Sequence, residues 1–234
     1  MMYPDTLSSD PQTPLAEQAF RRLRRDVLAG TFPADGKLKI EELQGQYGFS
    51  SSPLREALSR LTQEGLVRAD ERRGFRVASL SAADLADITR MRLKLDVDAL
   101  ADAIDCGDDE WEARVVAAFH RLDKVEGKLG DGPVQLNDEW SELHRTFHMV
   151  LISSAPSERL KNWCASLFDQ AERYRRASAR LRQTARRKSN EHRKIMDAAL
   201  RRDRDTACAL LAEHIKSTEQ NVNLVLRALA QKGR

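Results

Sequence analysis

Cysteine and long apolar runs are both scarce in this 234-residue sequence. Its three cysteines, Cys106, Cys164 and Cys208, lie far apart and form no C-x-x-C pair, so neither a disulfide framework nor a zinc ribbon is expected. The apolar stretches are short, such as residues 149–152, whereas a helix that crosses a bilayer needs roughly 20 apolar residues. The N-terminus has neither the basic nor the apolar region of a secretory signal. We therefore expect a cytoplasmic protein without a membrane segment.

Motifs of several enzyme classes are missing as well. The sequence contains no G-x-S-x-G nucleophile turn, no P-loop and no G-x-G-x-x-G phosphate loop. None of its five histidines belongs to an H-E-x-x-H or an E-x-x-H motif, so the zincin and di-iron signatures are absent. What is present is a globular composition, with 41% hydrophobic and 32% charged residues and a net charge of +3. These values exclude disordered, collagenous and fibrous proteins.

The sequence pattern changes near residue 79, which divides the chain into two regions. Before it, short helical patterns alternate with glycine and proline, and after it helical periodicity dominates without a fixed-length repeat. We assign residues 12–78 to a first domain and residues 79–234 to a second, all-α bundle, so the fold class is mainly α. Six or seven helices are expected in the bundle, over approximately residues 81–104, 108–129, 134–154, 157–183, 187–201 and 204–230.

The first domain has the pattern of three helices followed by a hairpin. Apolar residues recur on one helical face between Ala16 and Val27, and residues 40–47 predict a second short helix. A third helix opens at a run of serines able to cap it and stops at Gly65. Apolar and polar residues alternate on both sides of position 73, and this pattern predicts a two-stranded hairpin. This combination is typical of a winged helix-turn-helix.

The third helix has two distinct faces. Its leucines point inward, whereas Ser51, Ser52 and Arg55 lie on the opposite side near the N-terminal end. A recognition helix needs this arrangement, because its first turn reaches base edges, where arginine can make two hydrogen bonds to guanine. Arg73 at the wing tip could reach a minor groove or the DNA backbone. The alternative is an ordinary solvated helix face.

The segment FSSSPLREALSRLTQEGLV, followed by RRGFRVA, resembles the DNA-binding domain of the GntR family of bacterial transcription regulators. The resemblance implies binding to double-stranded operator DNA, with contacts from Ser50, Ser52, Arg55 and Gly74. The family often has arginine where this chain has Ser51, so the operator sequence is not implied.

Four of the five histidines are placed where they could meet. His144 and His148 are four residues apart on one expected helix, so their rings leave the same face and could chelate one cation. His192 and His214 each lie on a further helix. The alternative is a set of ordinary core or surface histidines. His120 has no matching partner, and we interpret it as structural.

Two arginines interrupt apolar helical faces. Arg92 shares a face with Ile88, and Arg175 shares one with Phe168. A buried guanidinium needs an anionic partner, because a buried charge without one is costly. That partner is either a carboxylate of the protein or the carboxylate of a ligand, and the sequence leaves both open.

The segments HRTFH, EHRKIMDAALRRD and LLAEHI resemble, in order and spacing, the FCD ligand-binding domain found in the FadR branch of GntR proteins. The resemblance implies a divalent metal at His148, His192 and His214, with His144 where the family usually has aspartate or asparagine. A nitrogen ligand at that position favours zinc, with nickel or cobalt as alternatives. It also implies a small organic acid as effector, which favours the ligand interpretation of the two arginines.

Within that branch the chain is similar to regulators of the CsiR/GlaR type, on segments such as GDDEWEARV and LFDQAERYRR. This similarity implies a C4–C6 dicarboxylate effector such as glutarate. We therefore predict a homodimeric transcription regulator, expected to be a repressor, whose operator binding is controlled by an organic acid at a metal site. The alternatives are a metal-dependent enzyme with an accessory DNA-binding domain, and an architectural DNA-binding protein, which would leave the histidines unexplained.

Overall fold

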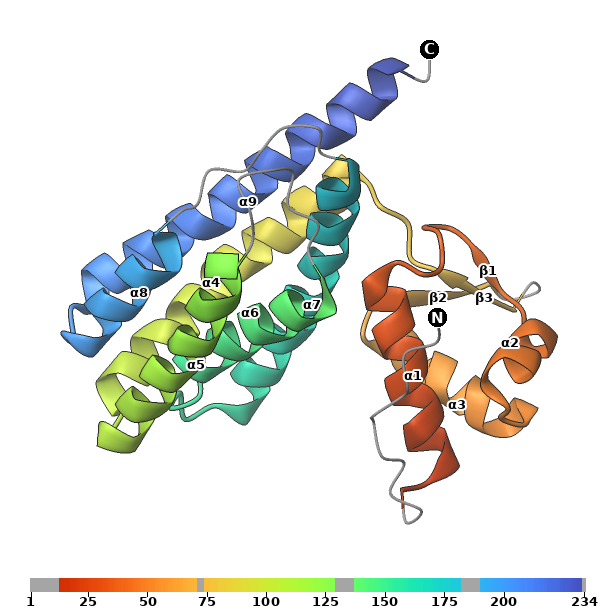
Figure 1. Ribbon diagram of the computed structural model, residues 1–234, viewed down its shortest axis with the longest axis horizontal. Coiled ribbons are helices and arrows are strands. Elements are labelled where there is room, and N and C mark those ends of the chain that lie inside the picture. The colour runs from red at the N-terminus through yellow and green to blue at the C-terminus, as the bar shows by residue number, and fades with distance from the viewer. Residues whose placement is uncertain (1–12, 71–73, 129–136, 182–189, 233–234) are drawn as a thin grey trace. The chain divides into compact units, whose positions relative to one another are not determined.

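Helices make up most of the protein in a computed structural model, which describes residues 13–70, 74–128, 137–181 and 190–232, with side chains up to residue 225 (Figure 1). The chain folds as two compact units that divide after Ser79. Small and mixed elements form the first unit, and long helices form the second. The predicted class, mainly α with a small β-wing, is confirmed.

The first unit contains three helices and three short strands. Gly30 and Gly48 end the first two helices in the left-handed conformation, with φ of 67° and 73°, which glycine adopts without strain. Leu23 and Leu58 are fully buried in a core built by all three helices and the sheet. The elements are α1 (Leu15–Ala29), β1 (Lys37–Leu38), α2 (Ile40–Tyr47), α3 (Ser51–Gln63), β2 (Val67–Asp70) and β3 (Gly74–Val77).

The strands form an antiparallel sheet in the order β1-β3-β2. The expected hairpin is β2–β3, with Val67 opposite Val77 and Asp70 opposite Gly74. The sequence did not predict β1, because a strand of two residues is too short to show an alternating pattern. Residues 71–73, which include the predicted DNA contact Arg73, lie outside the described residues.

The second unit is a helical bundle. Two caps fix where its helices begin: Ser81 accepts a hydrogen bond from the Asp84 N–H at 3.1 Å, as expected, and Asn137 accepts one from the Trp140 N–H at 2.8 Å. The Asn137 cap starts its helix four residues later than predicted. The helices are α4 (Ala82–Cys106), α5 (Asp109–Lys128), α6 (Asp138–Leu151), α7 (Glu158–Leu181), α8 (Glu191–Leu200) and α9 (Arg204–Lys232).

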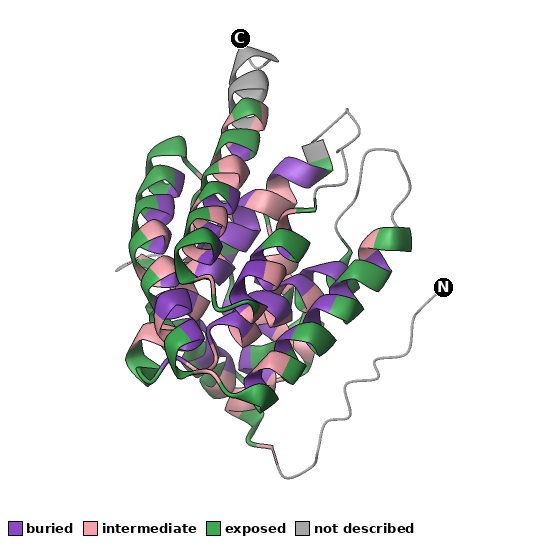
Figure 2. Ribbon diagram, turned by 90° about the vertical axis from the view of Figure 1, so that its left-hand side faces the viewer, coloured by how far each residue is buried: buried purple, intermediate pink, exposed green. Residues whose placement is uncertain are grey.

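Buried residues line the inward faces of these helices (Figure 2). Trp111 is fully buried on α5, and its indole N–H donates to the Val150 carbonyl at 3.1 Å, which joins α5 to α6. Arg202 donates to the Ile104 carbonyl at 2.6 Å and so satisfies the C-terminal end of α4. Among the described residues no helix is long and apolar enough to span a membrane.

The turn between α4 and α5 has no room for a side chain at Gly107. A Cβ there would lie 2.3 Å from the Trp111 ring and 2.8 Å from the Ala103 carbonyl oxygen. We expect Gly107→Ala to lower the free energy of unfolding by about 1–3 kcal/mol, because the indole must move in a packed core. Gly127→Ala is the matched control, since a Cβ there meets nothing within 4 Å. Equal denaturation midpoints for the two variants would contradict this packing.

Candidate functional site

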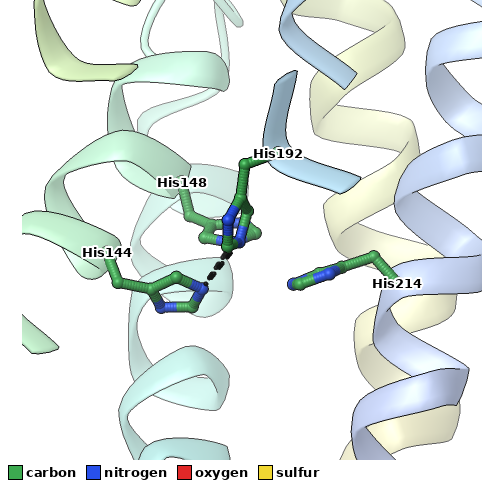
Figure 3. A group of neighbouring side chains, drawn as sticks. All are labelled: His144, His148, His192 and His214. Atoms are coloured by element: carbon green, nitrogen blue, oxygen red, sulfur yellow. Dashed lines mark hydrogen bonds between the residues drawn. The ribbon is translucent and has the colours of Figure 1, made fainter. Parts of the chain in front are cut away.

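The four predicted histidines meet in the middle of the helical bundle. His144 and His148 come from α6, His192 from α8 and His214 from α9, and all four are buried. One ring nitrogen from each lies within 4.8 Å of the others, so the side chains converge on one point (Figure 3). His120 is exposed on α5, outside this cluster.

The ring nitrogens face one another at short range. Nε2 of His144 lies 3.0 Å from Nε2 of His192 and 3.2 Å from Nε2 of His148. In a tetrahedral zinc site with Zn–N bonds of about 2.0–2.1 Å, neighbouring nitrogens lie about 3.3 Å apart. Two of the nitrogen pairs therefore have nearly the spacing of such a site, whereas the full set spreads to 4.8 Å and must contract around a cation.

Burial favours the neutral form of three of these imidazoles, those of His144, His148 and His214. It lowers the pKa of His144 and of His148 well below the ordinary value, and neighbouring cationic groups lower both further. Burial also lowers the pKa of His214 to about 4, although the Glu191 carboxylate opposes this shift. Neutral imidazole is the form that ligates metal ions. The donor set consists of four nitrogens, which suits zinc, nickel or cobalt better than magnesium or calcium.

Two histidines of the cluster have a glutamate carboxylate next to Nδ1, the ring nitrogen on the side away from the cluster. Glu191 Oε2 lies 2.7 Å from Nδ1 of His214, and Glu126 Oε1 lies 3.4 Å from Nδ1 of His192. The Trp140 indole N–H donates to the same Glu126 oxygen at 3.2 Å. A carboxylate at Nδ1 fixes the ring so that Nε2 points at the cation, an arrangement common around metal-binding histidines. Sequence reasoning missed both glutamates, because nothing in their spacing pointed to the histidines they serve.

Arg92 is buried and paired with a carboxylate of the protein. Its Nε donates to Asp96 Oδ2 at 2.8 Å, and the two side chains are 8% and 10% exposed. Burial raises the pKa of Asp96, although Arg92 and then Cys164 oppose this shift. The guanidinium carbon lies 5.1 Å from the centre of the Phe168 ring. In this structure, the anionic partner of Arg92 is therefore a carboxylate of the protein and not that of a ligand.

Arg175 reaches the histidine cluster itself. Its Nη1 lies 2.7 Å from Nδ1 and 3.0 Å from Nε2 of His144, and the guanidinium also pairs with Glu172. Its guanidinium carbon lies 5.5 Å from the centre of the Phe168 ring. That ring is 5.4 Å from the His144 ring, so both predicted arginines lie close to the cluster.

One cavity that borders the cluster is very small. A cavity of about 10 Å³ borders His148 and is lined also by Asp96, Met149 and Leu211. This volume is at the lower limit for a single water molecule. Any organic acid that binds here therefore needs side chains to move.

In the other unit, the predicted DNA-contacting residues lie at the exposed start of α3. Ser50, Ser51, Ser52 and Arg55 are all exposed. Ser50 occupies the N-cap position but its side chain makes no capping hydrogen bond, contrary to expectation. The first N–H groups of the helix are thus available to an anion such as a phosphate. Gly74 is exposed with φ of 85°, at the first position of β3.

Arg55 differs from the arginines of α1. Arg21 pairs with Glu17 at 2.7 Å, and Arg24 pairs with Glu64 at 2.8 Å. Within the described part of the chain, no carboxylate pairs with Arg55. Its charge is therefore not neutralised inside the unit.

An exposed helix next to a β-wing is the architecture of DNA-binding transcription regulators. The model of the family described as "Bacterial regulatory proteins, gntR family" matches residues 15–77, and the FCD domain model matches residues 87–217. The chain belongs to the GntR family and contains an FCD domain. This confirms the family resemblance.

Two curated relatives are similar over most of their length. The chain is 39% identical to the regulator BphR of Paraburkholderia xenovorans, over 87% of this chain and 83% of the relative. It is 36% identical to the transcriptional repressor GlaR of Escherichia coli, over 84% of this chain and 90% of the relative. Among solved structures, E. coli McbR/YncC has a TM-score of 0.70 at 18% identity, over 93% of this chain and all of that one, which supports the fold.

Proposed function

We propose that this transcription regulator is a homodimeric repressor whose operator binding is controlled by a small organic acid. The acid binds beside a divalent metal in the FCD domain. One observation carries the proposal: four buried imidazoles converge within 4.8 Å of one another, with a guanidinium against one of them. Imidazole nitrogens are common metal ligands, and the arginines supply the positive charge that a carboxylate needs.

The metal is held by His144, His148, His192 and His214 in this proposal. When bound, it supplies a Lewis-acidic charge that attracts a carboxylate. Zinc is the first candidate, because imidazole nitrogen is one of its common ligands, and nickel and cobalt are the alternatives.

The acid is a C4–C6 dicarboxylate, with glutarate the first to test. Arg92 on α4 and Arg175 on α7 both place their guanidinium groups near the Phe168 ring. Two guanidinium groups beside a metal suit a ligand with two carboxylates better than one with a single charge. The resemblance to regulators of the CsiR/GlaR type, described in the sequence analysis, implies the same class of effector.

The DNA is read by the first turn of α3 and the wing. Arg55 contacts a base edge, while the serines at positions 50–52, together with Gly74 and Arg73, contact the backbone or the groove. A homodimer presents two such helices to the two halves of a near-palindromic operator. Because operator DNA of bacteria lies in the cytoplasm, this function is a cytoplasmic one.

A metal-dependent enzyme remains the second candidate. The same four nitrogens could also hold a catalytic metal. The family match favours regulation over catalysis.

A thermal-shift screen of mono-, di- and tricarboxylates tests the proposal. Zinc-loaded and chelator-treated protein are compared, and we expect a C4–C6 dicarboxylate to raise the melting temperature of the zinc-loaded protein. Ligand at a hundred times its Kd stabilises a protein by about 2.7 kcal/mol, which such a scan detects readily. If no carboxylate shifts the melting temperature of zinc-loaded protein, the proposed effector class is wrong.

Replacing Arg92 separates acid binding from the other activities. We expect Arg92→Ala to retain one metal per chain and operator binding, but to lose the carboxylate-induced thermal shift and release from DNA. Arg90→Ala is the control, since Arg90 is exposed on the same helix and pairs with Asp87. A normal acid response in Arg92→Ala would show that Arg92 only neutralises Asp96.

A further inference from the structure

Among the cluster histidines, His144 has a cation against its ring nitrogens, whereas two others have a carboxylate at Nδ1. Nδ1 of His214 and of His192 face Glu191 and Glu126, as described above. Nη1 of Arg175 instead lies within 3.0 Å of both ring nitrogens of His144. The charged group next to His144 is therefore positive, whereas those next to His192 and His214 are negative.

This difference matters because a neutral imidazole has one acceptor nitrogen. If Nε2 of His144 ligates a metal, Nδ1 must hold the proton and can only donate a hydrogen bond. Arg175 is also only a donor, so the present contact cannot coexist with that state. A divalent cation at Nε2 would in addition repel the guanidinium a few ångströms away, in a buried region where charges are weakly screened.

We propose that Arg175 and the metal compete for His144, and that metal binding moves the Arg175 guanidinium away from His144 to a position where it holds a carboxylate of the acid. This inference rests on the proposed function and adds an order to it: the metal loads first and the acid second. Metal and acid then favour each other's binding, because each stabilises the same position of Arg175.

Two features of the surroundings support the movement. The cavity beside His148 is at most large enough for one water, so an acid beside the cluster needs more room than this cavity offers. Trp140 and Phe168 present ring faces to the guanidinium carbon at 5.1 and 5.5 Å, and Glu172 pairs with it from the same helix. The guanidinium thus keeps favourable neighbours when it leaves His144.

Zinc titration of Arg175→Ala tests the competition directly. In the absence of carboxylates, we expect this variant to bind zinc about tenfold more tightly than the unmodified protein, a coupling of ordinary size for two ligands that share a site. A residue that only supports the fold of the site would give the opposite result, since its loss would weaken zinc binding.

Arg176→Ala is the matched control. Arg176 is the next residue on α7 and pairs with Glu172 at 3.1 Å and Asp138 at 2.6 Å. Its removal also deletes one positive charge, but it makes no contact with His144 among the described residues. We expect its zinc affinity to equal that of the unmodified protein. If Arg175→Ala loses its helical circular dichroism, Arg175→Gln, which is neutral and polar but shorter than arginine, takes its place with the same expectation.

The second half of the proposal is tested with succinate, glutarate and adipate. We expect at least one of them to stabilise zinc-loaded protein more than zinc-free protein, and to give no shift with Arg175→Ala. Unchanged or weaker zinc binding by Arg175→Ala would overturn the competition, and equal acid shifts with and without zinc would overturn the order. If the unmodified protein binds no zinc, nickel or cobalt, the proposed metal site itself fails, which is a different result from either.

Discussion

Protein purified without a histidine tag should contain about one zinc, nickel or cobalt ion per chain, and His192→Ala should contain almost none. His192 is the sole contribution of α8 to the cluster, and its Nε2 lies 3.0 Å from that of His144. Loss of a partner behind a metal ligand costs 10–100-fold in affinity, so loss of the ligand itself should cost at least about a hundredfold. Elemental analysis and a competition titration with a zinc indicator measure both quantities.

His120→Ala is the control for this prediction. His120 is exposed on α5 and lies outside the cluster, so its removal deletes one imidazole without touching the site. We expect its metal content to equal that of the unmodified protein. A metal-free unmodified protein with normal thermal unfolding would contradict the metal centre, and the four rings would then be only a polar part of the core.

The Arg55→Ala variant should bind operator DNA far more weakly than the unmodified protein. A bidentate contact from arginine to guanine contributes about 1–3 kcal/mol of discrimination, and a homodimer makes the contact twice. Operator affinity should therefore fall by about 2–6 kcal/mol, whereas affinity for unrelated DNA should change little. Fluorescence anisotropy with both DNAs at one salt concentration measures the difference, because phosphate contacts vary strongly with salt.

Arg90→Ala is the control for the loss of charge. It removes one exposed arginine from the helical unit and should lower affinity for both DNAs slightly and equally. If Arg55→Ala also lowers both affinities equally, Arg55 contacts only phosphate, and the bases are read by other residues of α3 or by the wing.

The features that the sequence predicts well are those set by local spacing. The helix α3 follows from an apolar stripe that ends in glycine, and the observed bounds are Ser51–Gln63. His144 and His148 share a face because of their separation along α6. Family resemblance then supplied the two distant histidines, and the structure brings all four together.

The features that the sequence did not predict depend on how helices pack. Glu126 lies behind His192, 66 positions away in the chain, and Arg175 contacts His144 from α7. Such contacts follow from the rotation of each helix about its axis, which apolar periodicity defines only coarsely. Sequence reasoning therefore predicted the histidines and arginines of the site, but neither the glutamates nor which charge lies against which ring.

Burial of the imidazoles has a consequence for how the regulator would respond over time. His144 is 1% exposed and His148 is 5% exposed, so an ion among these rings exchanges only when the helices open locally. Short episodes of metal starvation would then pass without effect on transcription, because the resident ion outlasts them. Under the proposed function, the ion would act as a lasting part of the folded chain, and the rapidly varying signal would be the concentration of the organic acid.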